Sequence, residues 1–73
     1  MTVQEMKSLK VGDMVLDYEM SVKFSSTVIC RVFEVDETGV AITSLEEKFK
    51  GSYPHRFLYS IDSLKLRKVE IKL

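Results

Sequence analysis

Few residues in this chain carry the side chains that catalysis or metal binding requires. The sequence contains one histidine, His55, and one cysteine, Cys30, so a zinc site built from histidine and cysteine cannot form within a single chain. Cys30 lies in a segment typical of a strand, where a thiol usually serves as a small apolar side chain. The three glycines are far apart, which excludes a phosphate-binding glycine loop. We therefore expect no enzymatic activity, no metal and no cofactor.

A group of aromatic and basic side chains in residues 48–72 is the remaining candidate for binding chemistry. Exposed aromatic rings stack on nucleobases and basic side chains contact phosphates, so a small barrel that binds nucleic acid would use such residues. Alternatively, Phe57 and Tyr59 fill the core and the basic residues are spread over the outer surface. The candidate binding residues are Phe49, Tyr53, His55, Arg56, Arg67 and Lys68.

The charges divide unevenly along the chain, although their sum is zero. Residues 1–47 contain four basic and nine acidic residues, and residues 48–73 contain seven basic and two acidic residues. Neighbouring strands can interleave the two halves, in which case the charges are dispersed instead of forming a dipolar surface.

Length and composition indicate one small folded domain over residues 1–73. A chain of 73 residues supports a single modest core, and a content of 45% hydrophobic and 30% charged residues is ordinary for a folded protein. A lone cysteine cannot form an internal disulfide, which favours a reducing setting. No apolar run is long enough to cross a bilayer, and the first residues lack the pattern of a signal peptide. We expect a cytoplasmic protein without membrane association.

The N-terminal residues predict a short helix. Thr2 and Glu5 have the spacing of a capping box, which favours a helical turn over residues 3–9. Met6 and Leu9 are three residues apart and would share one side of this turn. We expect these two side chains to cover the open end of a barrel.

Five short strands are predicted from β-branched content and from the alternation of apolar and polar residues. They cover residues 14–18, 27–35, 40–43, 56–61 and 66–73. Residues 36–39 supply the turn of a hairpin, residues 20–26 and 46–55 are predicted to be loops, and residues 60–64 a short turn. Five strands favour a small barrel, because closure removes exposed sheet edges. An open antiparallel sheet is the alternative.

Three segments resemble parts of SH3-like barrels. Residues 9–15, with a turn at Gly12 and Asp13, look like the opening of their first strand, residues 32–42 like their central hairpin, and residues 61–64 like their final turn. The pattern is also similar to that of short, mostly uncharacterised proteins of bacterial genomes and their phages, especially in Bacteroidetes. The resemblance implies a mainly β fold, a five-stranded SH3-like barrel with a short N-terminal helical turn, and it assigns no functional residue.

A second resemblance is to Sm-like RNA-binding proteins, which also combine an N-terminal helix with a five-stranded barrel. Bacterial members carry a Tyr-Lys-His step near the last strands, and this chain has Tyr53, Pro54 and His55 at the corresponding place. The proline replaces the lysine, and the predicted helix is shorter than theirs, so the match is partial.

Missing catalytic groups, zero net charge and the first resemblance favour a non-enzymatic protein-interaction module, an accessory protein of a phage or mobile element that docks on a larger partner. The alternative is a nucleic-acid-binding barrel that uses the basic, aromatic-containing segment 48–72. A barrel this small can leave residues 28–35 or 69–73 as an unpaired edge strand, which allows a homodimer or a higher oligomer.

Overall fold

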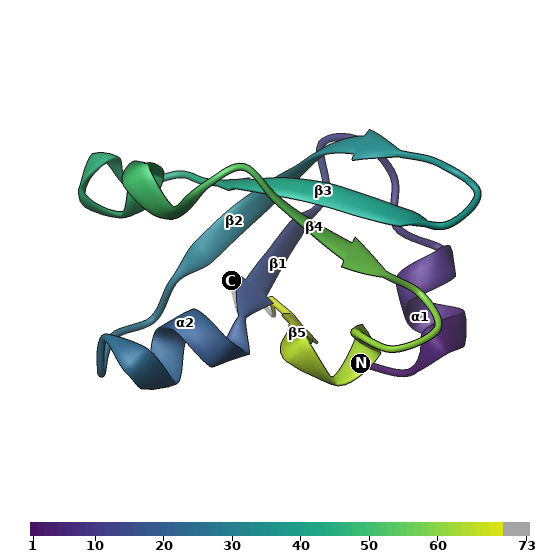
Figure 1. Cartoon of the computed structure of the whole chain (residues 1–73), viewed down its shortest axis with the longest axis horizontal. Helices are drawn as coiled ribbons and strands as arrows, with labels where there is room; N and C mark the ends of the chain where they lie inside the picture. Colours follow the sequence, from purple (N-terminus) through teal and green to yellow (C-terminus); the bar gives the residue numbers. More distant parts are fainter. Residues whose placement is uncertain (70–73) are drawn as a thin grey trace, which may run out of the picture.

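The computed structural model describes residues 1–69 and shows five antiparallel strands curled into a half-barrel (Figure 1). The strands are β1 Met14–Asp17, β2 Ile29–Val35, β3 Gly39–Ser44, β4 His55–Leu58 and β5 Leu66–Lys68. The helices are α1 Val3–Lys7, α2 Tyr18–Lys23 and the two 3₁₀ helices η1 Glu47–Ser52 and η2 Ser63–Lys65. The prediction of a mainly β fold with an N-terminal helical turn is confirmed.

The order of strands in the sheet is β4-β3-β2-β1-β5, and every neighbouring pair is antiparallel. The predicted hairpin is confirmed as β2 and β3. Asp36 holds its turn, because Oδ1 accepts the N–H groups of Thr38 at 2.8 Å and of Gly39 at 3.1 Å. This Asx-type turn sets the register of the two longest strands.

The free edges of the sheet belong to β4 and β5. Residues 28–35 were a candidate edge, but β2 pairs with both β1 and β3, so that prediction is wrong. β5 is an edge strand, and the part of the predicted strand 66–73 beyond residue 69 lies outside the described residues. At the β4 edge, Asp62 Oδ2 accepts the Leu58 N–H at 2.8 Å, and an acidic side chain at this place protects the edge from further strand pairing.

The core lies between α1 and the concave face of the sheet. Its buried members are Met6, Val15, Val28, Cys30, Val32, Val40, Ile42, Phe49, Phe57, Tyr59 and Leu66. Met6 is fully buried and Leu9 packs against the same cluster, so the N-terminal residues cover one end of the half-barrel as predicted. The capping box is present, with Glu5 N–H donating to Thr2 Oγ1 at 3.0 Å and Thr2 N–H donating to Glu5 Oε1 at 2.9 Å.

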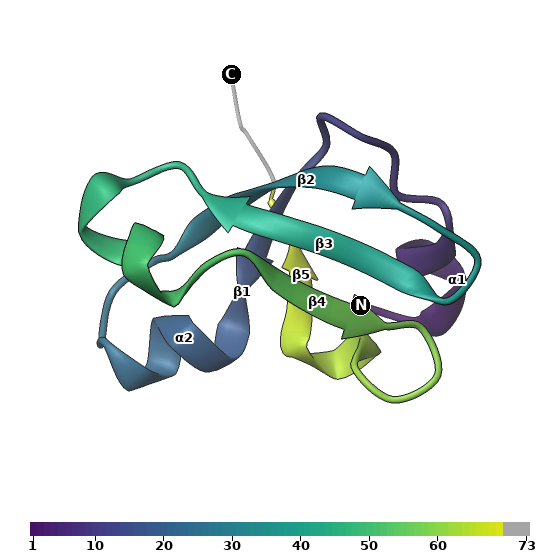
Figure 2. The same cartoon turned by 45° about the horizontal axis from the view of Figure 1, so that its top comes forward.

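Several predicted boundaries are wrong, and α2 is the largest difference. Residues 20–26 were predicted to be a loop, whereas Tyr18–Lys23 forms a helix. Residues 46–55 contain η1 and the first residue of β4. In Figures 1 and 2, α2 lies below one end of the sheet and α1 lies at the other end. Within residues 1–69, no helix combines the length and the apolar character that crossing a membrane requires.

Candidate functional site

Asp17 positions the helix α2. Its Oδ1 accepts the Met20 N–H at 3.2 Å, which is the side-chain cap of a helix start. Its backbone oxygen accepts the Ser21 hydroxyl at 2.6 Å. Glu19 in the first turn and Lys23 in the last turn complement the helix dipole. The cap and these two charges are readable in the sequence, but residues 20–26 are polar and serine-rich, which is why they were interpreted as a loop.

A partly buried hydrogen bond from Tyr53 holds the Asp17 side chain in place. The Tyr53 hydroxyl donates to Asp17 Oδ2 at 2.7 Å, and Asp17 is only 1% exposed. Burial raises the pKa of the Tyr53 hydroxyl, and contacts with Cys30 and Asp17 add to the shift, so this hydroxyl remains a donor at neutral pH. Burial likewise raises the pKa of the Cys30 thiol to about 11. Cys30 is a fully buried, protonated core residue, as predicted.

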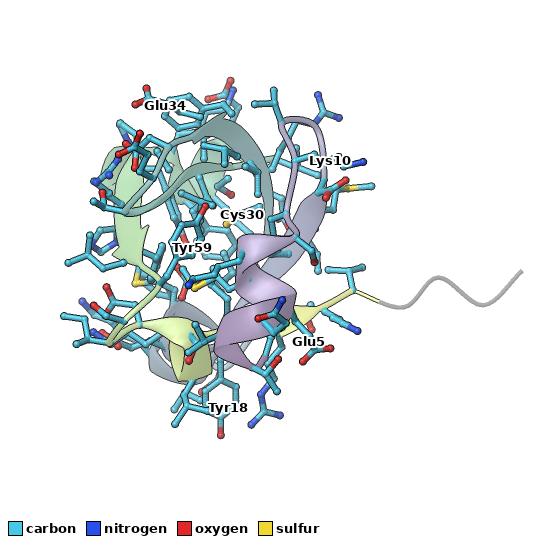
Figure 3. The ribbon with its side chains drawn as sticks, turned by 90° about the vertical axis from the view of Figure 1, so that its right-hand side faces the viewer. Glu5, Lys10, Tyr18, Cys30, Glu34 and Tyr59 are labelled. Atoms are coloured by element: carbon cyan, nitrogen blue, oxygen red, sulfur yellow. The ribbon has the colours of Figure 1, made fainter. Side chains whose placement is uncertain are left out.

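The outer side of α2 carries apolar side chains. Tyr18 and Val22 are four residues apart and therefore share one side of the helix, whereas Met20 packs against the core. Leu64 of η2 adjoins them, and the three exposed side chains line a hollow of about 340 Å³ together with Glu19 and Lys65. Tyr18, Val22 and Leu64 are 40%, 61% and 81% exposed. Figure 3 shows Tyr18 projecting away from the core residues Cys30 and Tyr59.

Lys65 holds η2 beside α2. Its backbone N–H donates to Asp62 O at 3.0 Å, and its Nζ lies 3.0 Å from Asp62 Oδ1 and 3.9 Å from Glu19 Oε2. The Leu58 N–H and Lys65 both lower the pKa of Asp62, so this carboxyl is ionised at neutral pH. The result is a short turn that presents Leu64 to solvent next to Val22.

Arg67 of β5 completes this region. Its guanidinium carbon lies 3.8 Å from the centroid of the Tyr18 ring, in the geometry of a cation–π contact. Register places Arg67 opposite Leu16 of β1, two residues before Tyr18. We call Tyr18, Val22, Leu64 and Arg67, with Glu19 and Lys65 at the rim, the α2–η2 surface.

Comparisons with known proteins do not assign this surface. No family model, curated protein or solved structure matches the chain. Among residues 1–69, no group of three or more histidine, cysteine, aspartate or glutamate side chains is placed to hold a metal ion. The candidate site therefore depends on the geometry of the chain itself.

The aromatic candidates predicted from the sequence do not form an exposed stacking platform. Phe49 is 6% exposed and belongs to the core, so it is not accessible to a ligand. Tyr53 is half-buried, with its hydroxyl bonded internally. His55 is exposed at the start of β4, with its ring centroid 6.3 Å from that of Tyr53 and 5.2 Å from that of Phe57. The alternative prediction, that Phe57 and Tyr59 fill the core, is confirmed.

Most of the basic residues in this segment form ion pairs. Lys48 pairs with Glu46, Lys50 with Glu47, Arg56 with Asp36, Lys65 with Asp62 and Glu19, and Lys68 with Glu5. Five of the six basic residues between 48 and 69 thus have a carboxylate partner. Five of these six ion pairs use an acid from residues 1–47. Three of the five join distant segments, Arg56 with Asp36, Lys65 with Glu19 and Lys68 with Glu5, so the fold interleaves the two oppositely charged halves. Of the six predicted site residues, only Arg67 belongs to the α2–η2 surface.

Sequence reasoning missed Tyr18, Val22 and Leu64. The available signal was a set of large apolar residues inside polar segments, with Tyr18 and Val22 at helical spacing. That spacing has meaning only when residues 18–23 are recognised as a helix, which they were not.

We expect the stability of the fold to decrease as the pH falls from about 4.5 to about 2. The hydrogen bond from Lys68 lowers the pKa of Glu5 from 4.5 to about 2. The Thr38 N–H and the Arg56 guanidinium lower the pKa of Asp36. A carboxyl whose pKa is lower in the folded state contributes stability that is present above its unfolded pKa and is lost as the pH falls through its folded pKa.

Thermal unfolding followed by circular dichroism across this pH range measures the effect. The Glu5→Gln variant cannot titrate at this position, so its unfolding midpoint should decrease less with acidification than that of the wild type. The same decrease in both proteins would show that the pair of Glu5 and Lys68 does not contribute.

Proposed function

We propose that this chain is a non-enzymatic protein-interaction module that docks on a larger protein through the α2–η2 surface. The observation that carries the proposal is the joint exposure of Tyr18, Val22 and Leu64 beside an arginine. Large apolar side chains gathered on one exposed surface are typical of sites that a partner covers. Tyrosine and arginine are also the residue types most enriched at the energetic centre of protein interfaces.

The ion pairs of residues 48–69 favour a protein over nucleic acid as the partner. Affinity for nucleic acid comes largely from basic side chains that replace counterions on phosphates. Here five of six such side chains have a carboxylate within 4.0 Å, and Phe49, the first aromatic residue of the segment, is buried. We expect binding to generic DNA or RNA no tighter than about 10⁻⁴ to 10⁻⁶ M at physiological salt.

The wider role that we propose is that of an accessory protein of a phage or mobile element acting in the cytoplasm. Its support is the similarity of the overall sequence pattern to short proteins of bacterial genomes and their phages, together with a lone, buried Cys30 that remains a thiol.

Leu64→Glu is expected to weaken capture of the natural partner about tenfold or more, because it places a charge where the partner would exclude water. Leu64 is 81% exposed, so the substitution should leave the fold intact. The measurement is quantitative capture from a lysate of the source cells on immobilised wild type and variant. The matched control is Val11→Glu, which changes an exposed valine outside the α2–η2 surface.

Equal capture by the wild type and both variants would refute docking through this surface. Submicromolar binding of an oligonucleotide at physiological salt would instead establish the nucleic-acid alternative. Light scattering of the purified protein measures its oligomeric state. If the wild type is a dimer and Leu64→Glu is a monomer, the surface serves self-association instead.

A further inference from the structure

We infer that the α2–η2 surface receives a peptide segment of its partner in which a carboxylate lies close to an aliphatic side chain. This inference rests on the proposed function and specifies the chemistry of the partner. The carboxylate binds to the guanidinium of Arg67, and the aliphatic side chain enters the hollow between Tyr18, Val22 and Leu64.

Arg67 has unused hydrogen-bonding capacity. Within residues 1–69, no carboxylate lies within ion-pair distance of it. The Tyr18 ring covers one face of the guanidinium at 3.8 Å, but stacking leaves the N–H groups at the edge of the plane free to donate. A guanidinium edge matches a carboxylate in a two-bond arrangement. An acidic side chain is therefore the group that this arginine is best placed to bind.

The two other arginines lack this combination of features. Arg56 Nη2 lies 2.6 Å from Asp36 Oδ2, so an internal carboxylate already occupies it. Arg31 is exposed on β2, with neither a ring contact nor a carboxylate partner in the described part of the chain. Stacking restricts the Arg67 side chain before a partner arrives, and a side chain that is already ordered loses less conformational entropy on binding.

The charges at the rim of the hollow leave Arg67 as the cation available to a partner. Lys65 is shared by two acids, Glu19 at 3.9 Å and Asp62 at 3.0 Å, and is therefore already paired. Among residues 1–69, Arg67 is the basic residue of the α2–η2 surface that has no carboxylate partner. A partner's carboxylate is therefore attracted to Arg67 itself, and this charge complementarity favours an acidic over a basic segment.

The hollow itself provides the aliphatic contact. Its volume of about 340 Å³ and its walls of Tyr18, Val22 and Leu64 are suited to an aliphatic side chain. The partner's carboxylate must reach Arg67 from the same segment, because Arg67 stacks on the Tyr18 ring that forms one of these walls. Recognition then depends on both groups together.

Selection from a displayed library of random short peptides on the immobilised wild-type chain tests this inference. We expect the enriched peptides to share Asp or Glu a few positions from Leu, Ile, Val or Met. Arg67→Glu should weaken the binding of a synthesised enriched peptide about tenfold or more. Arg31→Glu changes a matched exposed arginine and should leave the affinity of the peptide within about twofold of the wild-type value. Replacing the acid of that peptide with lysine should restore part of the affinity for Arg67→Glu.

The possible failures of this test are distinguishable. Enriched peptides that lack an acid, or that bind Arg67→Glu as tightly as the wild type, refute the acidic-partner inference. If those peptides still lose affinity for Leu64→Glu, the proposed docking surface stands. Peptides insensitive to both substitutions refute both. A library that yields no enrichment over background refutes the inference of a peptide segment, and the capture experiment with Leu64→Glu then tests the docking surface separately. Circular dichroism of each variant establishes that the fold is retained.

Discussion

Replacing Gly39 with alanine is expected to lower the free energy of unfolding by about 3 kcal/mol. A β-carbon at this position would lie 2.0 Å from the carbonyl oxygen of Phe57 and 3.1 Å from the Cα of Leu58. Both contacts are to backbone, so no change of side-chain rotamer can relieve them. The strand β4 would have to move away from β3, which also breaks the hydrogen bond from Tyr59 N–H to Thr38 O.

Gly51→Ala is the matched control, because a β-carbon there meets no atom within 4 Å. Its free energy of unfolding should stay within about 0.5 kcal/mol of the wild type. Urea unfolding followed by far-ultraviolet circular dichroism measures both variants. A small domain has only a few kcal/mol of total stability, so Gly39→Ala should unfold at a much lower urea concentration. Similar midpoints for the two variants would contradict the close approach of β3 and β4.

Asp17→Ala is expected to cost about 2–4 kcal/mol of stability and to loosen α2. The substitution removes the helix cap, which contributes about 1 kcal/mol. It also leaves the half-buried Tyr53 hydroxyl without its acceptor at 2.7 Å, a loss of about 1–3 kcal/mol. Because α2 carries Tyr18 and Val22, the same variant should bind the partner more weakly without altering any exposed side chain of the α2–η2 surface.

Two related variants separate these contributions. Asp17→Asn keeps an oxygen acceptor and a good capping residue, so it should lose less than half as much stability as Asp17→Ala. A double-mutant cycle that combines Asp17→Ala with Tyr53→Phe should show a coupling of about 1 kcal/mol or more. A coupling near zero would mean that the hydrogen bond between the two side chains contributes nothing to stability.

The parts of the fold that local sequence determines were predictable. The cap formed by Thr2 and Glu5 and the hairpin around Asp36 depend on residues at most a few positions apart. Their spacing therefore carries the information directly. The helix α2 was missed because residues 20–26 are polar and serine-rich, and because its cap, Asp17, is held in place by Tyr53, which is 36 residues away. A contact over that distance leaves no periodic signal in the sequence.

The candidate site was less predictable than the fold, because exposure depends on the packing of distant segments. Phe49 and Arg67 both looked available in the sequence, yet one is buried in the core and the other is exposed on an edge strand. The same limit applies to charge. Pairs such as Lys68 with Glu5 form only because β5 packs near α1. Such pairs neutralise basic residues that look like a continuous positive segment in the sequence.

Because Cys30 is buried, the reactivity of its thiol reports how often the folded chain opens. It is the single cysteine of the sequence, and its side chain is inaccessible in the folded state. A thiol-specific reagent can therefore modify it only in molecules whose half-barrel has opened. When reclosing is faster than modification, the labelling rate is proportional to the population of the open form. No engineered label is needed. The reaction measures exposure of the interior at the pairing of β1 with β2, where Cys30 lies opposite Val15.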